Sequence, residues 1–273
     1  IPILRPICQC LAANEISSIC GILNGTTNYI LTEMIQMGKS FEQALREAQQ
    51  KGYAEADPTA DVEGIDAGRK VCILADLCFG KNVSPGSITT EGITKITPAD
   101  IDCARALGYK IKLLGRAMRT GPNSVTAFVA PHLISKSAPL ANVDGVMNGI
   151  SVRGDAVGEA MFFGPGAGSL PTASAVAADI IDCVREPGTR TYTGWWPSEP
   201  GYVTAPDKVS CRWMVRTSSP LADIAAAFSG VRFINSPNAP SDEYAFVTGY
   251  MSGEELKAKT AGMNVLAKYR VLD

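Results

Sequence analysis

A segment rich in proline and glycine, late in the chain, limits what this sequence can fold into. Residues 187–206 contain four prolines and three glycines, namely Pro187, Pro197, Pro200, Pro206, Gly188, Gly194 and Gly201. Such residues interrupt helices and strands, so the segment is predicted to be a linker. The 273-residue chain is therefore expected to hold a larger domain over residues 1–186 and a smaller one over residues 207–273.

The larger part mixes strand patterns with helix patterns. Apolar and β-branched runs predict strands at residues 16–24, 109–118, 124–130, 146–152 and 156–163. Cap residues and apolar periodicity predict helices at residues 29–37, 40–52, 62–77, 98–107 and 171–185. This mixture predicts an α/β (α+β) fold in which helices pack on a mixed sheet.

The smaller part has a regular order of predicted elements. Strand, helix, strand, strand, helix and strand patterns follow one another at residues 209–217, 220–228, 231–234, 245–250, 253–261 and 265–272. The order βαββαβ is that of the ferredoxin-like unit.

Charge and hydropathy exclude several classes of partner. The chain has 25 Lys and Arg against 27 Asp and Glu, a net charge of −2, so it has no basic surplus for a phosphate backbone. Its apolar N-terminal stretch, residues 1–23, is interrupted by Arg5, Gln9, Asn14 and Glu15, unlike a signal peptide. We expect no nucleic acid partner, no membrane association and a cytoplasmic location.

Cysteine and histidine usage argues against a metal centre. The eight cysteines form no Cys-x-x-Cys pair, and His132 is the single histidine of the sequence. Most of the cysteines stand in apolar runs, where a free thiol behaves as a small hydrophobic group, as in a reducing cytoplasm. His132 is predicted to lie at a strand end rather than in a catalytic triad.

The stretch from Gly52 to Lys70 concentrates the groups best suited to chemistry. Asp66 and Lys70 are four residues apart, so on a helix their side chains can touch. Glu55, Asp57 and Asp61 precede them in the sequence. Such a pair is also common on solvated surfaces, where it contributes about 0.3–0.5 kcal/mol. The apolar neighbours Ala67, Val71, Leu74 and Ala75 indicate a core helix and favour a functional pair.

Two glycine-containing turns are candidate ligand sites. Residues 24–28, Asn-Gly-Thr-Thr-Asn, can present backbone N–H groups to an anion at a helix start, or can form an ordinary helix cap. Residues 164–168 have the pattern Gly-x-Gly-x-Gly, and Ser169 departs from the dinucleotide fingerprint Gly-x-Gly-x-x-Gly. A tight turn between a strand and a helix explains the second segment equally well.

These segments together resemble homoserine dehydrogenase. The motifs that carry the resemblance follow the family order across residues 1–186: Gly21-Ile-Leu-Asn-Gly-Thr-Thr-Asn-Tyr-Ile-Leu31, Gly52-Tyr-Ala-Glu-Ala-Asp-Pro58 with Asp61, Gly64, Asp66 and Lys70, Lys110-Ile-Lys-Leu-Leu114, Pro139-Leu-Ala141, and Phe163-Gly-Pro-Gly-Ala-Gly168 with Pro171-Thr-Ala173.

The resemblance implies an activity and roles for residues. The family reduces L-aspartate 4-semialdehyde to L-homoserine with NAD(P)H, on the route to threonine, methionine and isoleucine. It implies that Asp66 and Lys70 lie at the reacting oxygen, and that Gly164, Gly166 and Gly168 adjoin the cofactor. The residues implied to hold the amino acid part of the substrate are Gly25, Thr26, Tyr53, Glu55 and Asp61. A homodimer or a higher homo-oligomer is the family expectation.

The sequence departs from the family pattern at its N-terminus. Family members begin with a Rossmann half that carries the glycine fingerprint, a second active-site lysine, and a segment that helps bind a monovalent metal ion. Only the closing Ile1-Pro2 of that segment is present. We therefore expect the main NAD(P)-binding half and the metal site to be absent, and the 273-residue chain to be inactive alone.

The smaller part resembles the ACT regulatory domain of many homoserine dehydrogenases. Residues 212–228 and 245–250 carry this resemblance, and Ser218-Ser-Pro-Leu221 stands where the family turn usually has an Asp and a Gly. Threonine feedback is accordingly a hypothesis. Two alternatives to an enzyme portion stay open: an amino-acid-sensing regulatory protein without turnover, and a purely structural α/β domain.

Overall fold

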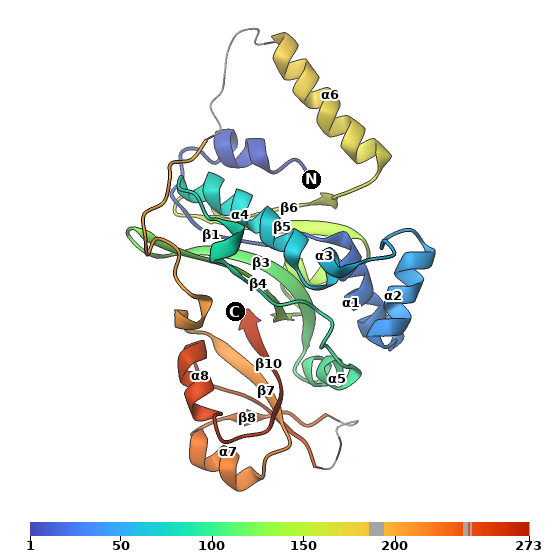
Figure 1. Ribbon diagram of the computed structural model, residues 1–273, viewed down its shortest axis with the longest axis vertical. Helices are drawn as coiled ribbons and strands as arrows, with labels where there is room; N and C mark the ends of the chain where they lie inside the picture. The colour runs from blue at the N-terminus through green and yellow to red at the C-terminus, as the bar shows by residue number, and fades with distance from the viewer. Residues whose placement is uncertain (186–193, 237–239, 241, 273) are drawn as a thin grey trace.

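A single mixed β-sheet forms the backbone of the molecule (Figure 1). The computed structural model describes residues 1–185, 194–236, 240 and 242–272. The strands of this sheet are β1 (Ile16–Ile22), β2 (Thr89–Thr90), β3 (Tyr109–Gly121), β4 (Ser124–Ser135), β5 (Met147–Gly154), β6 (Gly158–Pro165), β7 (Arg212–Thr217), β8 (Arg232–Phe233), β9 (Tyr244–Val247) and β10 (Val265–Leu272).

The strand order joins both predicted parts in one sheet. The order is β6-β5-β1-β3-β4-β10-β7-β9-β8, and β2 pairs with β4 beside this path. Strand β4 pairs in parallel with β10 and with β2, whereas the other neighbours are antiparallel. The predicted α/β fold with a mixed sheet is thereby confirmed.

Helices pack on the sheet, and α1 and α4 share its main core. They are α1 (Gly25–Met37), α2 (Phe41–Gln50), α3 (Thr59–Val62), α4 (Ile65–Phe79), α5 (Pro98–Ala106), α6 (Ser169–Arg185), α7 (Leu221–Ala227) and α8 (Gly253–Lys259), and a π-helical turn spans Pro6–Cys10. Ile30 of α1 and Val71 and Ala75 of α4 are buried in the main core with Ile111 of β3. None of the described helices has both the length and the apolar composition needed to span a bilayer.

Helix α1 and the helix predicted at residues 62–77 differ from the sequence prediction. Helix α1 begins at Gly25 rather than Tyr29, because the Asn24 side chain accepts a hydrogen bond from the Thr27 amide at 2.9 Å and caps the helix. The helix predicted at residues 62–77 is divided into α3 and α4. Gly64 lies between them with φ of +78°, a left-handed conformation that favours glycine.

The smaller part of the chain from residue 207 onward, which we call the tail, has the element order predicted for it. Elements β7, α7, β8, β9, α8 and β10 follow one another as βαββαβ, and their strands lie side by side in the order β10-β7-β9-β8. All neighbouring pairs within this group are antiparallel, as in a ferredoxin-like unit. Residues 187–193 of the predicted linker lie outside the described residues, and residues 206–208 form a 3₁₀ turn.

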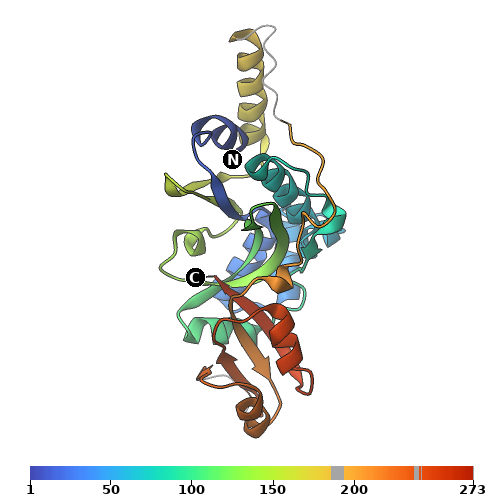
Figure 2. The same cartoon turned by 90° about the vertical axis from the view of Figure 1, so that its left-hand side faces the viewer.

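Helix α6 stands away from the rest of the molecule, at the end opposite α7 and α8 (Figure 2). The predicted helix at residues 171–185 is present and begins at Ser169. Most of its side chains are exposed, including Leu170 at 81%, and Arg5 forms ion pairs with Asp179 and Asp182 in its second half.

Candidate active site

The start of α1 forms one wall of the candidate site. Asn24 is buried at the end of β1 and caps the helix through its side-chain oxygen. Gly25 follows it, and a Cβ atom at this position would lie 2.7 Å from the carbonyl oxygen of Val146. Glycine is therefore required here, because the helix start packs directly against the backbone that leads into β5.

The side-chain amide nitrogen of Asn24 forms hydrogen bonds to two carboxylates. It donates to Asp61 Oδ1 at 2.7 Å and to Asp66 Oδ2 at 3.0 Å. One side chain thus caps α1 and also holds α3 and the start of α4 in place. Hydrogen bonds to ionised carboxylates are stronger than neutral ones, so this contact orients both acids.

Lys70 completes a continuous polar chain. Its Nζ donates to Asp66 Oδ2 at 2.6 Å and to the carbonyl oxygen of Leu23 at 3.2 Å. The contact expected from the spacing of Asp66 and Lys70 is present. The side chains are 30% and 50% exposed, so the pair is reachable by a ligand while the helix beneath it is buried.

A small cavity opens at Lys70. Its volume is about 260 Å³, and its walls are mostly apolar, with contributions from Ile3, Ile22 and Leu74. Asn148 and Gly166 supply the polar and backbone groups that share the cavity with Lys70. A pocket of this kind, apolar with a few directed polar groups, is typical of a small-molecule site.

Gly166 is needed for the shape of this cavity. A Cβ atom on Gly166 would lie 1.7 Å from Asn148 Oδ1, a separation that no side chain could tolerate. The Asn148 amide nitrogen donates to the carbonyl oxygen of Ile22 at 2.8 Å, so its position is held by β1. Gly166 and Asn148 are therefore in close contact where they line the cavity.

The remaining predicted residues are placed unevenly around this centre. Thr26 Oγ1 donates to the carbonyl oxygen of Tyr53 at 2.6 Å, so these two predicted residues are adjacent. The Glu55 side chain is exposed. Asp57 instead accepts hydrogen bonds from the amide and hydroxyl groups of Thr59 at the start of α3.

Of the three glycines expected at a cofactor, only Gly166 lines the cavity. Gly164 lies in β6, where a Cβ atom would come within 2.8 Å of the Ile1 side chain. Gly168 has φ of +116° just before α6, so it serves the turn from strand to helix. The turn explanation therefore accounts for Gly168.

The sequence does not predict the roles of two polar residues of the site, Asn24 and Asn148. The sequence indicates Asn24 as part of a helix cap but not as the link between Asp61 and Asp66, and it gives no indication of Asn148. An asparagine at a predicted helix start is a local pattern that can be found. Asn148, in contrast, reaches the cavity only through the pairing of β1 with β5.

His132 has no place in this site, and its predicted position at a strand end is wrong. Strand β4 continues to Ser135 because β3 and β10 pair with it there, so His132 lies within the strand and is fully buried. Burial lowers the pKa of His132 well below 6.5, and its ring contacts Ala130 O and Arg116 Nη1. Within the described residues, no group of three or more His, Cys, Asp or Glu side chains is arranged to hold a metal ion.

An ammonium paired with a carboxylate, at the mouth of an apolar cavity and carried by a helix over a mixed sheet, defines a small-molecule enzyme site of the α/β class. The chain belongs to the homoserine dehydrogenase family, whose model matches residues 2–181.

Known relatives agree with this assignment. The chain is 53% identical over 185 residues to homoserine dehydrogenase of Neisseria gonorrhoeae, a match that covers 68% of this chain and 42% of that protein. It is 45% identical over 239 residues to the Mycobacterium leprae enzyme, covering 85% of this chain and 53% of the relative. The chain thus spans about half the length of these relatives or less.

Solved structures show the same fold. A homoserine dehydrogenase from Thiobacillus denitrificans superposes with a TM-score of 0.87 at 36% identity, over 100% of this chain and 68% of that one. A hyperthermophilic archaeal homoserine dehydrogenase mutant in complex with NADPH matches with a TM-score of 0.58 at 31% identity, over 69% of this chain and 54% of that one.

Proposed function

We propose that this chain is the substrate-binding and catalytic portion of an NAD(P)-dependent homoserine dehydrogenase, which reduces L-aspartate 4-semialdehyde to L-homoserine for threonine, methionine and isoleucine biosynthesis. The observation that carries the proposal is the polar chain Asp61–Asn24–Asp66–Lys70 at the mouth of the cavity. It provides one positive charge for a developing oxyanion and a fixed carboxylate to orient that charge.

Lys70 and Asp66 take the catalytic roles in this proposal. A bound NAD(P)H supplies the hydride that adds to the aldehyde carbon. The Lys70 ammonium faces the carbonyl oxygen, stabilises the negative charge that develops there and donates the proton that completes the alcohol. Asp66 accepts a hydrogen bond from Lys70 and keeps the ammonium aimed at the cavity.

The amino acid part of the substrate is assigned to the wall next to α1. The first-turn amides of α1 at Gly25 and Thr26 suit the substrate carboxylate, because a helix start carries partial positive charge. Glu55 and Asp61 suit the substrate ammonium group. Tyr53, whose carbonyl accepts from Thr26, limits the outer edge of this wall.

The described residues fit the reacting end of a nicotinamide cofactor. The apolar walls of the cavity can receive a ring beside Lys70 and Gly166, with Gly164 at the end of β6 and Gly168 in the turn that follows it. A cavity of about 260 Å³ is too small for a whole dinucleotide. We therefore assign the main NAD(P)-binding surface and the monovalent metal site to parts of the protein outside these residues.

The proposal predicts that activity depends on a nucleotide-binding half. We expect the 273-residue chain alone to show no NADH or NADPH oxidation with L-aspartate 4-semialdehyde. We expect turnover after the N-terminal region of the Neisseria gonorrhoeae relative is fused before Ile1, measured as the decrease in nicotinamide absorbance. A fusion with Lys70→Met is the matched control.

Each outcome of this comparison has a meaning. Turnover by the chain alone would contradict the dependence on a second half. A folded fusion that binds homoserine but never turns over would favour the alternative, an amino-acid-sensing protein without catalysis.

The tail is assigned as an ACT-like domain with a closed ligand turn. Its βαββαβ order and strand arrangement support this assignment. The turn after β7 is already occupied by internal hydrogen bonds: Ser218 Oγ accepts from the Asn264 side chain at 2.6 Å, and Ser219 Oγ accepts from the Asn264 amide at 2.7 Å. These bonds fix the positions of both serine side chains, and a ligand that approached the turn would compete with Asn264 for their oxygens.

We expect threonine not to bind at this turn. Isothermal titration of the chain with millimolar threonine should give no binding heat, and the melting temperature should stay unchanged. Saturable heat that becomes larger or tighter after Asn264→Ala would show that the turn opens for an effector, and the feedback hypothesis would then stand.

Two further assignments complete the proposal. All eight cysteines lie within the described residues, and none of them forms a disulfide there, which suits a reducing cytoplasm. The family resemblance supports a homodimer or a higher homo-oligomer that acts on a small-molecule substrate.

A further inference from the structure

We infer that Lys112, buried beneath α1, is a positioning residue that sets the two walls of the substrate site relative to each other. The inference rests on the proposed function, because it concerns the same site. Lys112 lies on β3 between Ile111 and Leu113, and its side chain is 0% exposed. A lysine that is fully enclosed is unusual and needs specific partners.

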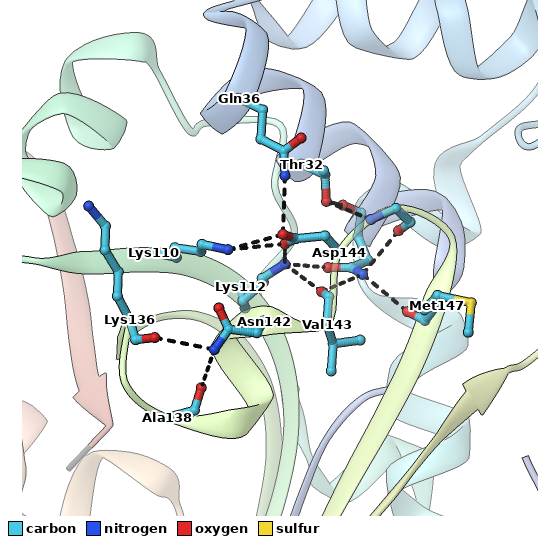
Figure 3. A network of polar contacts seen from close by, with 12 residues as sticks. Thr32, Gln36, Lys110, Lys112, Lys136, Ala138, Asn142, Val143, Asp144 and Met147 are labelled. Atoms are coloured by element: carbon cyan, nitrogen blue, oxygen red, sulfur yellow. Dashed lines mark hydrogen bonds and ion pairs between the residues drawn. The ribbon is translucent and has the colours of Figure 1, made fainter.

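Lys112 satisfies all of its donor capacity inside the protein. Its Nζ donates to Val143 O at 2.6 Å, to Asp144 Oδ1 at 2.8 Å and to Asn28 Oδ1 at 3.0 Å (Figure 3). Asp144 is 31% exposed and also accepts from Lys110 at 3.0 Å. Burial alone would raise the pKa of Asp144, but the bonds from Lys112 and Lys110 hold it below its usual value, so the carboxylate stays ionised.

Asn28 links Lys112 to helix α1, whose start forms one wall of the site. It lies in the first part of α1, and its amide nitrogen faces the carbonyl oxygens of Val143, Gly145 and Met147 at 3.0, 3.0 and 3.1 Å. One turn later, Thr32 Oγ1 accepts from the Gly145 amide at 3.0 Å. A single face of α1 is thereby fastened to the segment from residue 143 to residue 147.

The same segment connects directly to the cavity. The carbonyl oxygen of Val146 lies 2.7 Å from where a Cβ atom of Gly25 would be, and residue 148, the next after Met147, is the asparagine that faces Gly166. Lys112 therefore lies behind the α1 wall and the Asn148 wall without touching the cavity. Loss of its three bonds should let the two walls move apart.

The test uses the whole 273-residue chain with homoserine as the probe. We expect Lys112→Met to weaken homoserine binding about tenfold, equivalent to about 1.4 kcal/mol, in isothermal titration. We expect hydrogen exchange at the Thr27 and Asn28 amides to accelerate by a similar factor. The matched control is Lys110→Met, which removes another ion pair to Asp144 but no contact with Asn28; it should leave both values within about twofold of wild type.

The outcomes separate positioning from mere stability. A folded Lys112→Met chain with wild-type affinity and exchange would overturn the inference, whatever its melting temperature. If that variant does not fold, Asp144→Ala replaces it, because Asp144 is partly exposed and alanine removes the acceptor for Lys112; unchanged affinity and exchange in that variant would equally overturn the inference. If the wild-type chain binds no homoserine, the proposed function fails, and exchange at the α1 start still decides the role of Lys112.

Discussion

Replacing Lys70 by methionine is expected to lower the turnover of the active fusion by about 10²–10⁴-fold, the usual contribution of a positioned acid. Methionine keeps the length of the side chain but removes the positive charge and the proton beside the cavity. The KM for the semialdehyde should change much less, because the amino acid part of the substrate is held by the α1 wall. Steady-state kinetics with saturating NADPH measures both values.

A neighbouring residue provides the control for this experiment. Arg69 is also a basic residue on α4, is exposed and does not line the cavity at Lys70. Arg69→Met should therefore leave turnover within about twofold of wild type. Equal losses in the two variants would mean that positive charge on this helix, rather than Lys70 itself, supports the reaction.

Replacing Asn24 by aspartate is expected to disrupt the site while keeping the helix start. An aspartate oxygen can still accept from the Thr27 amide and cap α1. The other oxygen would face Asp61 and Asp66, where the asparagine nitrogen now donates at 2.7 and 3.0 Å. Three carboxylates would then converge, and the chain should lose about 2–3 kcal/mol of unfolding free energy at pH 7.

The pH dependence identifies the cause of this loss. Lowering the pH towards about 4 protonates one of the crowded carboxyls and restores a donor, so the deficit relative to wild type should shrink as the pH falls. Asn24→Ser, which can keep the cap without adding charge, should show a smaller deficit that does not vary in this way. Urea unfolding at both pH values measures the difference, and a deficit that is equal at the two values would contradict the electrostatic explanation.

Local parts of this structure could be predicted from the sequence. Asp66 and Lys70 meet because they are one helical turn apart, and the capping box of Ser40 with Gln43 closes the start of α2 as the pattern indicates. These contacts depend on a few consecutive residues. Once the helix forms, its local geometry alone brings these partners together.

The rest depends on contacts between residues far apart in sequence. Asn148 is held at the cavity by a hydrogen bond from its side-chain amide to the carbonyl oxygen of Ile22, 126 residues earlier. Lys112 has the alternation of a strand residue that faces water, yet α1 and the segment at Asp144 enclose it. The sequence predicts His132 at a strand end, whereas β4 continues beyond it because β3 and β10 pair with it there. No local sequence pattern indicates that pairing.

The pairing of β10 with β4 also decides how the tail is attached. Strand β10 runs beside β4, with Arg270, Val271 and Leu272 opposite His132, Leu133 and Ile134. Backbone hydrogen bonds therefore join the last strand of the tail to the main sheet. A protease that cut the connection between α6 and β7 would produce two fragments that stay together as a nicked pair. The tail therefore cannot rotate freely against the main sheet, because such a rotation would break the hydrogen bonds between β10 and β4.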